Sequence, residues 1–459
     1  MNEIRRRLSP ALLYLALVLP ATLILSLAFI NFHAPDDYDH VKRAYTLIHH
    51  PLQAVTPPGR STGAMIDTGL ADYVSAQRPV AILSRRPLPQ AEVAAFRSAP
   101  QLRWSGVESF SELPGAMNYF PALYAPQALA LELGRLTGAT VGESVLWARL
   151  ANGLVAILLV ALGLRLLPFG HSLVLVLLLL PRTLLQFASN AADPILHGLA
   201  LIVIAMGLRQ ATRLKPLAHN GLMAAALFVA ASVRPPIAAL AFTPAVQAVR
   251  NRQWLGLLLL GAGVAAAALW MLAIVGQVVD LRCGVDSGPL GPRLAAFATG
   301  WPGLVGHSLA DRGTYYFMSL VGEFGWGDGP NGHLPHPLPL WAYVCVIPLL
   351  IVAIRNDARA PARLDRLVRL SLAGGAAAVV LITFLALYVA CRGPVPTIIG
   401  GVQGRYFVPA LFAIAPAISG LAPSATKDRL QSLFPVLLGI WVTACMIEMM
   451  RAAPLLYRP

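Results

Sequence analysis

The sequence predicts an all-α polytopic membrane protein with about 11 transmembrane helices, which form a single integral membrane domain over residues 1–459. Hydrophobic residues make up 57% of the chain and charged residues only 12%, whereas soluble domains contain about a quarter charged residues. The mean hydropathy is +0.66. The net charge of +14 comes from short basic clusters between apolar runs, a pattern typical of membrane topology and not of a nucleic-acid-binding face.

The first apolar run covers about residues 10–31 and follows Arg5, Arg6 and Arg7. Its length of roughly 20 residues exceeds the apolar core of about 7 to 15 residues in a signal peptide, so we expect an uncleaved transmembrane helix. The positive-inside rule places the three arginines in the cytoplasm. The residues after this helix are therefore expected on the extracytoplasmic side.

Residues 33–140 contain no spanning apolar run until about residue 144. We expect them to form a large first extracytoplasmic loop with interfacial helices, one over residues 41–50 and another that follows the aromatic segment 119–124 and covers 128–136. Aromatic rings concentrate in the headgroup zone of a bilayer, which suits Tyr119 and Tyr124.

Further apolar runs complete the predicted set of about eleven spans of ordinary length, at about 144–166, 170–187, 194–210, 217–234, 236–249, 254–277, 338–355, 367–391, 405–421 and 431–450. Residues 278–336 are predicted to be a second large extracytoplasmic loop. Alternation from a cytoplasmic N-terminus puts nearly every short basic cluster inside and the C-terminus outside. We expect a multi-pass protein of the bacterial cytoplasmic (inner) membrane, surrounded by membrane lipids.

The same topology gathers unusual polar residues on the outer side. They come from distant parts of the chain: residues 36–40, 189–194, 234–236, 278–336 and 392–406. Ionisable groups at a bilayer boundary are costly and mark functional sites by default. Carboxylates and arginines that face one compartment predict a site for an anionic, polar substrate at the membrane surface.

Asp36 and Asp37 are the candidate catalytic residues, in the segment Pro-Asp-Asp-Tyr-Asp-His at 35–40. One carboxylate suffices to cap a helix that begins near residue 38, so another is available for chemistry. Asp39 is expected to be a solvated helix residue. His40 lies one turn later on the same face, either as a substrate-binding residue or as a surface histidine, and Arg43 is a further substrate-binding candidate.

The later outer turns supply the other substrate-binding candidates. Asp193 precedes a proline, which fits either a helix cap or a site residue. Arg234 and Arg405 end and begin predicted spans, so they either snorkel to the interface or bind a phosphate through the planar guanidinium. Glycines around Arg405 leave room for close backbone approach. Its neighbours Gln403 and Tyr406 are included among the candidates.

Metal use is left open by the sequence. Asp36, Asp37 and Asp193 would hold a divalent cation such as Mg²⁺ or Mn²⁺ if the protein uses one. A zinc site in the second loop is disfavoured, because the spacing of its candidate ligands matches no tight motif; these are His307, Glu323, Asp328, His333 and His336. The four cysteines form no CxxC pair, and a disulfide between Cys283 and Cys391 stays an open alternative.

Several segments resemble a bacterial membrane family catalogued as domain-of-unknown-function family 2142. They are APDDYDHVKRAY, YFPALYAPQALALELGRLTG, ARLANGL, LPRTLLQFASNAADPILHGLAL, SVRPPIAAL, VGEFGWGD, LPHPLPLWAY and GVQGRYFVPAL. The resemblance covers about residues 10–420. In layout this family is similar to the GT-C superfamily of integral membrane glycosyltransferases, which share an acidic motif in the loop after the first span and a second acidic residue at a later outer turn.

The resemblance implies an inverting glycosyltransferase with a polyprenyl-phosphate sugar donor and a glycan, lipid or protein acceptor on the outer face. Asp36 or Asp37 matches the general base, and Asp193 the second acidic position. Arg234 and Arg405 fall where phosphate-binding residues are useful. The family's Pro-Asp-Glu reads Pro-Asp-Asp here, which leaves open which carboxylate is catalytic, and relatives often have lysine at position 234.

Two other classes remain as alternatives. A transporter or flippase for a lipid-linked or anionic substrate would use the same outer charges, but such proteins often show inverted repeats and broken helices near the bilayer midplane, and the sequence shows no clear internal repeat. The second alternative is a non-catalytic partner in surface polysaccharide assembly.

Overall fold

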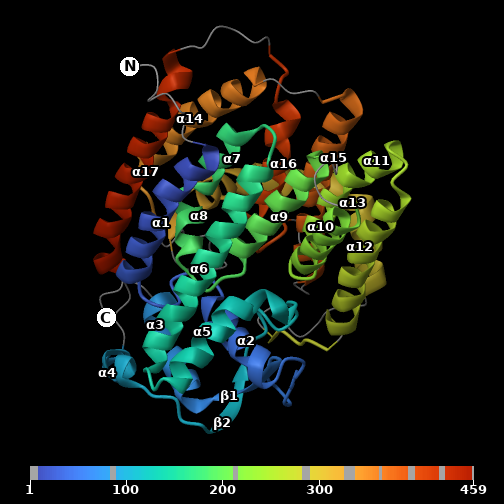
Figure 1. Ribbon diagram of the computed structural model, residues 1–459. Helices are drawn as coiled ribbons and strands as arrows, with labels where there is room; N and C mark the ends of the chain where they lie inside the picture. Colours follow the sequence, from blue (N-terminus) through green and yellow to red (C-terminus); the bar gives the residue numbers. More distant parts are fainter. Residues whose placement is uncertain are drawn as a thin grey trace.

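Two parts are stacked along the long axis of the molecule in the computed structural model: a bundle of apolar helices and a smaller part built by residues 33–140 (Figure 1). The structure describes residues 9–82, 89–209, 216–275, 277–281, 290–324, 336–360, 364–390, 398–422 and 429–456. Helices dominate these residues, so the predicted helical class is confirmed.

The apolar helices of the bundle fall into a long and a short class, whereas eleven spans of ordinary length were predicted. Within the described ranges, 6 helices are long and apolar enough to cross a membrane: α1 (Pro10–Ala28), α6 (Val141–Leu166), α12 (Trp254–Val275), α14 (Leu340–Arg359), α15 (Arg366–Ala390) and α17 (Arg429–Leu456). Three further apolar helices are shorter: α9 (Asp193–Leu208), α10 (Pro216–Ala231) and α16 (Val408–Ile418).

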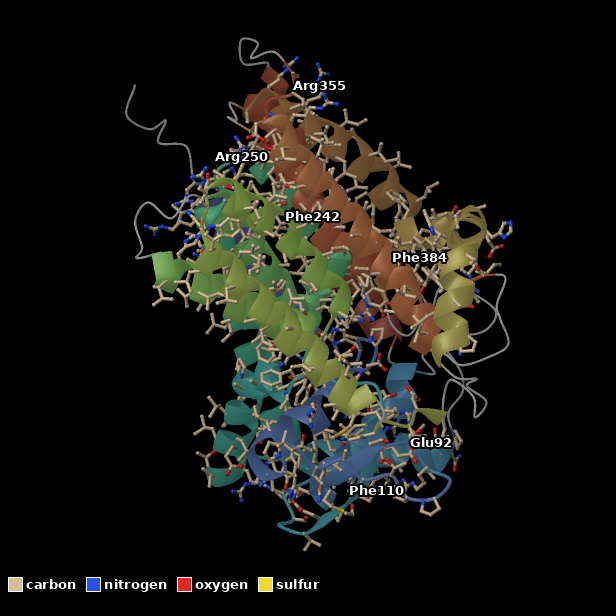
Figure 2. The ribbon with its side chains drawn as sticks, turned by 90° about the vertical axis from the view of Figure 1, so that its right-hand side faces the viewer. Glu92, Phe110, Phe242, Arg250, Arg355 and Phe384 are labelled. Carbon is tan, nitrogen blue, oxygen red and sulfur yellow. The ribbon has the colours of Figure 1, made fainter. Side chains whose placement is uncertain are left out.

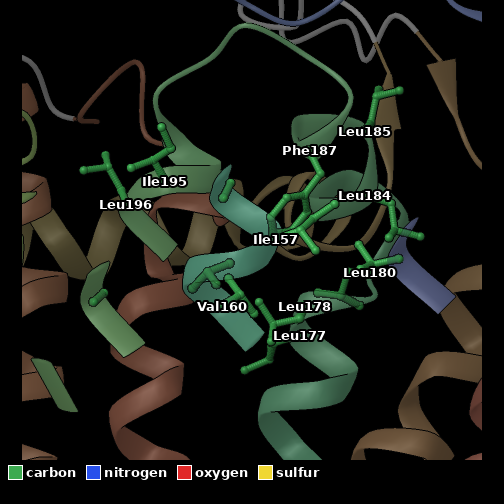
Figure 3. Packing of buried hydrophobic residues seen from close by; sticks show 14 of the residues in the cluster. Ile157, Val160, Leu177, Leu178, Leu180, Leu184, Leu185, Phe187, Ile195 and Leu196 are labelled. Carbon is green, nitrogen blue, oxygen red and sulfur yellow. The ribbon is translucent and has the colours of Figure 1, made fainter. Parts of the chain in front are cut away.

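Two of the predicted spans each consist of two helices, and Pro181 separates those of the first. The run at 170–187 forms α7 (His171–Leu178) and α8 (Pro181–Phe187), and the run at 236–249 forms the 3₁₀ helix η3 (Pro235–Ala241) followed by α11 (Phe242–Arg250). A proline cannot donate a backbone hydrogen bond and is favoured at the first position of a helix, where Pro181 and Pro235 stand. Leucines of α7 and α8 are buried against Ile157 and Val160 of α6 at the centre of the bundle (Figure 3).

The predicted second loop contains a long helix. α13 (Leu290–Val321) lies beside α15 (Figure 1), and the strands β3 (Glu323–Phe324) and β4 (His336–Pro337) follow it. The hydropathy pattern did not reveal α13, because Pro302, Asp311 and Arg312 interrupt its apolar residues.

The part formed by residues 33–140 contains both helices predicted there. The first is α2 (Asp37–His49), and the second is α5 (Ala125–Leu136), which continues from the 3₁₀ helix η2 (Pro121–Tyr124). The remaining elements were not predicted: β1 (Gly63–Asp67), α3 (Thr68–Ile82), α4 (Gln90–Ser98), η1 (Ala99–Gln101) and β2 (Glu108–Glu112). β1 and β2 pair antiparallel.

The two ends of the bundle differ in charge. Arg250 and Arg355 lie at the end remote from Glu92 and Phe110 of the 33–140 part (Figure 2). α1 begins at this basic end, whereas α17 finishes near the 33–140 part (Figure 1). The first and last described helices therefore begin and finish at opposite ends of the bundle (Figure 1).

A buried arginine fixes the connection between α1 and α2. Arg149 of α6 is 1% exposed, and its guanidinium donates to the carbonyl oxygens of Ser26 (2.9 Å), Phe29 (3.0 Å) and Ile30 (3.0 Å) and to the side chain of Asn31. The last carbonyls of a helix have no partner within the helix. Arg149 satisfies one of those of α1 and the two carbonyls that follow the helix, and it thereby holds the residues that lead to Asp36.

Replacement of Arg149 by methionine should lower the free energy of unfolding by about 2–4 kcal/mol, because several buried carbonyls lose a charged donor. Thermal unfolding in detergent measures the change. The matched control is R165M, since Arg165 lies on the same helix and is exposed. Equal melting temperatures of the two variants would contradict the structural role of Arg149.

Candidate functional site

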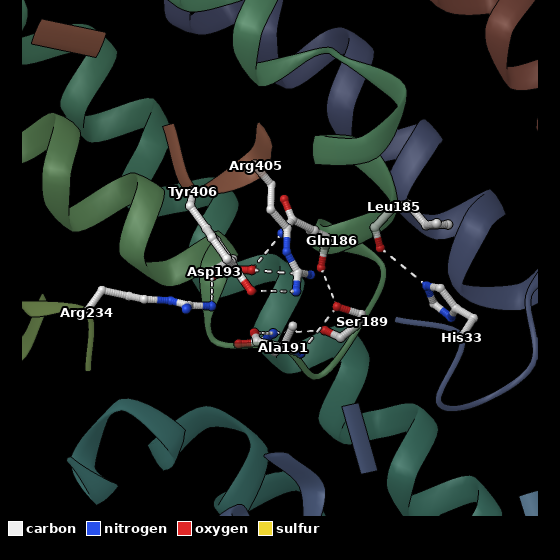
Figure 4. A network of polar contacts seen from close by, with 10 residues as sticks. His33, Leu185, Gln186, Ser189, Ala191, Asp193, Arg234, Arg405 and Tyr406 are labelled. Atoms are coloured by element: carbon white, nitrogen blue, oxygen red, sulfur yellow. Dashed lines mark hydrogen bonds and ion pairs between the residues drawn. The ribbon is translucent and has the colours of Figure 1, made fainter. Parts of the chain in front are cut away.

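Three charged residues from distant parts of the chain meet where the bundle joins the 33–140 part, and a fourth, Asp36, lies near enough for its charge to act on His40 and Tyr119 beside them. Asp36 immediately precedes α2, and Asp193 is the first residue of α9. Arg234 immediately precedes η3, and Arg405 lies in the 3₁₀ helix η5 (Gly404–Phe407). Figure 4 shows the arginines on either side of Asp193.

Asp193 is held by two arginines and an amide. Its Oδ1 lies 3.1 Å from Arg234 Nη2, and its Oδ2 lies 3.6 Å from Arg405 Nη1. Gln186 Nε2 donates to Oδ2 at 2.7 Å. The N-cap position of α9 belongs to Ala192, so Asp193 is an ion-pair partner and not a helix cap. Two guanidinium groups and one carboxylate leave this cluster with a net positive charge.

Tyrosine rings flank the arginines. The guanidinium of Arg234 lies 4.4 Å from the ring centre of Tyr406 and 5.9 Å from that of Tyr119. The guanidinium of Arg405 lies 5.2 Å from the ring of Tyr406. The negative face of an aromatic ring attracts a cation, so Tyr406 helps to hold two like charges close together.

Gly404 brings Arg405 to this position. A Cβ atom at Gly404 would lie only 1.9 Å from the carbonyl oxygen of Tyr316 in α13, so no other residue fits without a shift of backbone. The Gly404 amide also donates to Ser319 Oγ at 2.8 Å. α13 therefore sets the place of η5, and the glycine next to Arg405 serves close backbone approach as the sequence predicted.

Both arginines have buried donors without an acceptor. These atoms are Nε of Arg234 and both Nε and Nη1 of Arg405, the last of which is only ion-paired with Asp193 at 3.6 Å. Buried polar groups nearly always have a hydrogen-bond partner. Guanidinium donors match the oxygens of phosphate and carboxylate, so this pair is suited to bind an anion.

Asp36 faces the same cluster from α2. It occupies the N-cap position with a left-handed backbone, at a φ of 60°, and its side chain makes no capping hydrogen bond. The carboxylate of Asp36 therefore does not cap α2, and the interpretation of this side chain as a helix cap is wrong. Its charge acts on His40 and Tyr119 together with the charge of Asp193. Asp36 is partly exposed, and strained backbone of this kind clusters at functional sites.

Asp37 has a different environment from Asp36. It is 0% exposed, and its Oδ1 accepts a hydrogen bond of 2.7 Å from the backbone amide of Asn190. Burial raises the pKa of Asp37 to about 6, although the nearby Arg149 lowers it in part. Asp37 thus ties α2 to the turn before α9 and is remote from solvent.

His40 is buried and not a surface residue. Its Nδ1 lies 2.6 Å from the hydroxyl of Tyr124, and its ring stacks on Tyr119 at a centroid distance of 5.9 Å. Burial lowers the pKa of His40 to about 4. The imidazole is therefore neutral near pH 7 and supports the tyrosine ring beside Arg234.

Three other predicted residues have different surroundings. Arg43 donates to the carbonyl oxygen of Tyr119 at 3.2 Å. It therefore supports the backbone of Tyr119 and does not contact the Asp193 cluster. Gln403 is 7% exposed and precedes η5. The expectation of a solvated Asp39 is wrong: it is 1% exposed and accepts a hydrogen bond of 3.1 Å from the Gly115 amide.

The candidate metal and disulfide residues are only partly described. No group of three or more His, Cys, Asp or Glu side chains could hold a metal ion within the described ranges. The oxygens of Asp193 and Oδ1 of Asp37 already accept from protein donors, and use of a divalent cation stays a prediction. Cys283, Cys391, Asp328 and His333 lie outside the described residues.

Sequence reasoning missed the amides that hold the turn before Asp193. Asn152 of α6 and Gln127 of α5 are both 0% exposed, and Gln127 Nε2 donates to Asn152 Oδ1 at 2.8 Å. The signal was present, because a polar residue such as Asn152 inside an apolar helix marks an interior polar contact.

Comparisons with known proteins give a family and one distant structural likeness. A family model described as "Predicted membrane protein (DUF2142)" matches residues 17–414. No curated protein matches the sequence. The crystal structure of ArnT from Cupriavidus metallidurans in the apo state is similar at 15% identity and a TM-score of 0.32, over 94% of this chain and 76% of that chain.

Replacement of Asp193 by asparagine should destabilise the protein by about 3 kcal/mol, because the two buried arginines lose the charge that balances them. Inorganic phosphate should restore more stability to D193N than it adds to the natural protein, since an anion can replace the carboxylate. Thermal unfolding with and without phosphate measures both effects. The control is D72N at an exposed aspartate of α3, and D193N as stable as D72N without phosphate would refute the charge balance.

Asp37 should make the stability of the protein pH-dependent. The folded protein binds the Asp37 proton more tightly than the unfolded chain, because burial raises the pKa from 3.8 to about 6. Between about pH 4 and about pH 6 the natural protein should therefore lose up to about 3 kcal/mol of stability relative to D37N as the pH rises.

The variant D37N can still accept the Asn190 hydrogen bond, so it serves as the reference in thermal unfolding across this pH range. A constant difference in stability between the two proteins would show that the environment of Asp37 does not disfavour its charge.

Proposed function

The chain belongs to the DUF2142 family of predicted membrane proteins, and from that premise we propose that it is a membrane glycosyltransferase. It transfers a sugar from a polyprenyl-phosphate donor to an extracytoplasmic acceptor, which is a glycan, lipid or protein. The observation that carries this proposal is the arginine pair with buried, unused donors around Asp193, next to the partly exposed Asp36.

Arg234 and Arg405 bind the phosphate of the lipid donor in this proposal. Their cluster lies at the ends of apolar segments, where α10 ends and where η5 leads into α16. A lipid phosphate lies at the same depth, at the boundary between hydrocarbon and water. The net positive charge and the fork geometry of the guanidinium favour a phosphate over a neutral headgroup.

Asp36 is the general base. Of the two candidate carboxylates it is the partly exposed one, and its charge reaches His40 and Tyr119 on the side of the arginines. Asp37 is fully buried and bonded to the Asn190 amide, so it positions the turn before Asp193. The difference in burial supports Asp36, and not Asp37, as the base.

The reaction is a single displacement with inversion at the anomeric carbon. Asp36 removes the proton of the acceptor hydroxyl while the hydroxyl oxygen attacks the anomeric carbon. A new carbon–oxygen bond forms to the acceptor, and the bond between the anomeric carbon and the phosphate oxygen breaks. The electron pair of that bond leaves with the polyprenyl phosphate, whose growing negative charge Arg234 and Arg405 stabilise.

A transporter remains the second candidate, because one observation favours it. The segment that contains α7 and α8 is an interrupted helix in the bundle centre, and Arg182 in it is 3% exposed. Broken helices with buried charges are a feature of transporters. A transferase converts donor in detergent, whereas transport requires a sealed vesicle, and a non-catalytic assembly partner shows neither activity.

The variant D36N should lower the rate of sugar transfer by about 100-fold to 10,000-fold, the usual contribution of a general base. Binding of the polyprenyl-phosphate sugar should persist, since the arginines are intact. Transfer of a radiolabelled sugar in detergent measures the rate, and D72N on α3 is the matched control. Full activity of D36N would exclude Asp36 as the base.

A further inference from the structure

Every backbone polar group of the 189–191 turn has a partner: side chains bond five of the six groups, and the Ser189 amide donates to the backbone carbonyl oxygen of Gln186 at 3.1 Å. Asn152 Nδ2 donates to the carbonyl oxygens of Ser189 (2.8 Å) and Ala191 (3.0 Å). Gln127 Nε2 lies 3.4 Å from the carbonyl oxygen of Asn190, and Asp37 accepts the Asn190 amide hydrogen. Ser189 Oγ accepts from the Ala191 amide at 3.2 Å. The turn is therefore rigid without any helix or strand of its own.

This rigid turn presents one carboxamide with no partner. The side chain of Asn190 is 0% exposed, and neither its Oδ1 nor its Nδ2 has a hydrogen-bond partner. No other asparagine or glutamine in the described ranges is buried with both side-chain atoms unbonded. A buried amide without partners is costly, so a fold that fixes its backbone so completely points to a ligand for its side chain.

The place of Asn190 indicates which ligand it serves. Its backbone is bonded to Asp37, the neighbour of the proposed base, and Asp193 with its two arginines follows three residues later. The transferred sugar must lie between the base and the leaving phosphate. A carboxamide offers two donors and one acceptor, which suits neighbouring hydroxyl groups that each donate and accept.

We propose that Asn190 is a sugar-binding residue that recognises hydroxyl groups of the donor sugar, displayed by the turn that Asp37, Gln127 and Asn152 hold. This inference rests on the proposed function and extends it from the phosphate to the sugar. The phosphate is bound by Arg234 and Arg405, whereas Asn190 distinguishes a glycosylated lipid phosphate from a bare one.

The test compares two lipids on the full-length protein in detergent. One is a polyprenyl phosphate, and the other is the same lipid with a single hexose or pentose on its phosphate, chosen as the sugar that the natural protein binds most tightly. Asn190→Ala should weaken binding of the glycosylated lipid by about tenfold or more, the effect of one to two lost hydrogen bonds. Binding of the bare phosphate lipid should stay unchanged.

Two further variants separate recognition from folding. Asn152→Ala removes the donor that holds Ser189 and Ala191. It should therefore disorder the turn and weaken the binding of both lipids to the same extent. Asn190→Gln keeps the amide but moves it by one methylene, so it should change which sugar binds best. Thermal unfolding of each variant reports its folded state.

Each outcome decides the proposal. If Asn190→Ala weakens the binding of both lipids equally, Asn190 only supports the fold. If it weakens the binding of neither lipid, its amide is solvated by bound water only. Either result overturns the inference. If the natural protein binds neither lipid, the proposed function itself fails, and the inference fails with it. Loss confined to the glycosylated lipid supports both.

Discussion

The carboxylate of Asp193 requires positive partners where it lies, and this requirement organises the site. It is 7% exposed, and an isolated charge at such a place costs several kcal/mol. Arg234 and Arg405 come from segments about 40 and 210 residues further along the chain, and both reach it. Because two guanidinium groups surround one carboxylate, the cluster keeps a surplus of positive charge and guanidinium donors without an acceptor. The stability requirement and the capacity to bind an anion thus have the same origin.

The base and the anion site are linked through buried polar contacts. Arg149 bonds carbonyl oxygens at and just beyond the end of α1 and so holds the chain that leads to Asp36. Asp37 connects α2 to the turn before α9, and Gln186 connects α8 to Asp193. The last two contacts join α2 and α8 to residues 190 and 193, at the turn before α9 and at the start of α9. The distance between the proposed base and the arginines therefore depends on several side chains that would not touch the substrate.

Particular sequence signals predicted the helical class and several residues of the site. Charge next to an apolar run drew attention to Asp36 and Asp37, and guanidinium chemistry with nearby glycines drew attention to Arg405. The helical class and the helices α2 and α5 followed from hydrophobic pattern. The break before Pro181 and the long helix α13 did not, because hydropathy averages over a window and hides both a break inside an apolar run and a helix with interspersed charges.

Burial was the property that sequence reasoning judged worst. Asp39 was expected to be solvated and a surface position was one alternative for His40, yet both are buried: Asp39 accepts from the Gly115 amide, and His40 contacts Tyr119 and Tyr124. Gln127 and Asn152 escaped notice because each is a single amide among mostly apolar neighbours in the sequence. Their role depends on a turn that is distant in sequence, which no local pattern contains.

The central claim is that Arg234 and Arg405 bind the phosphate of a lipid-linked sugar beside Asp36. A structure determined in a lipid bilayer with a bound polyprenyl-phosphate sugar tests it most directly. We expect phosphate oxygens within hydrogen-bond distance of both guanidinium groups. The anomeric carbon should lie between the phosphate and Asp36. A phosphate bound elsewhere, with both arginines still engaged only by Asp193 and the tyrosine rings, would contradict it.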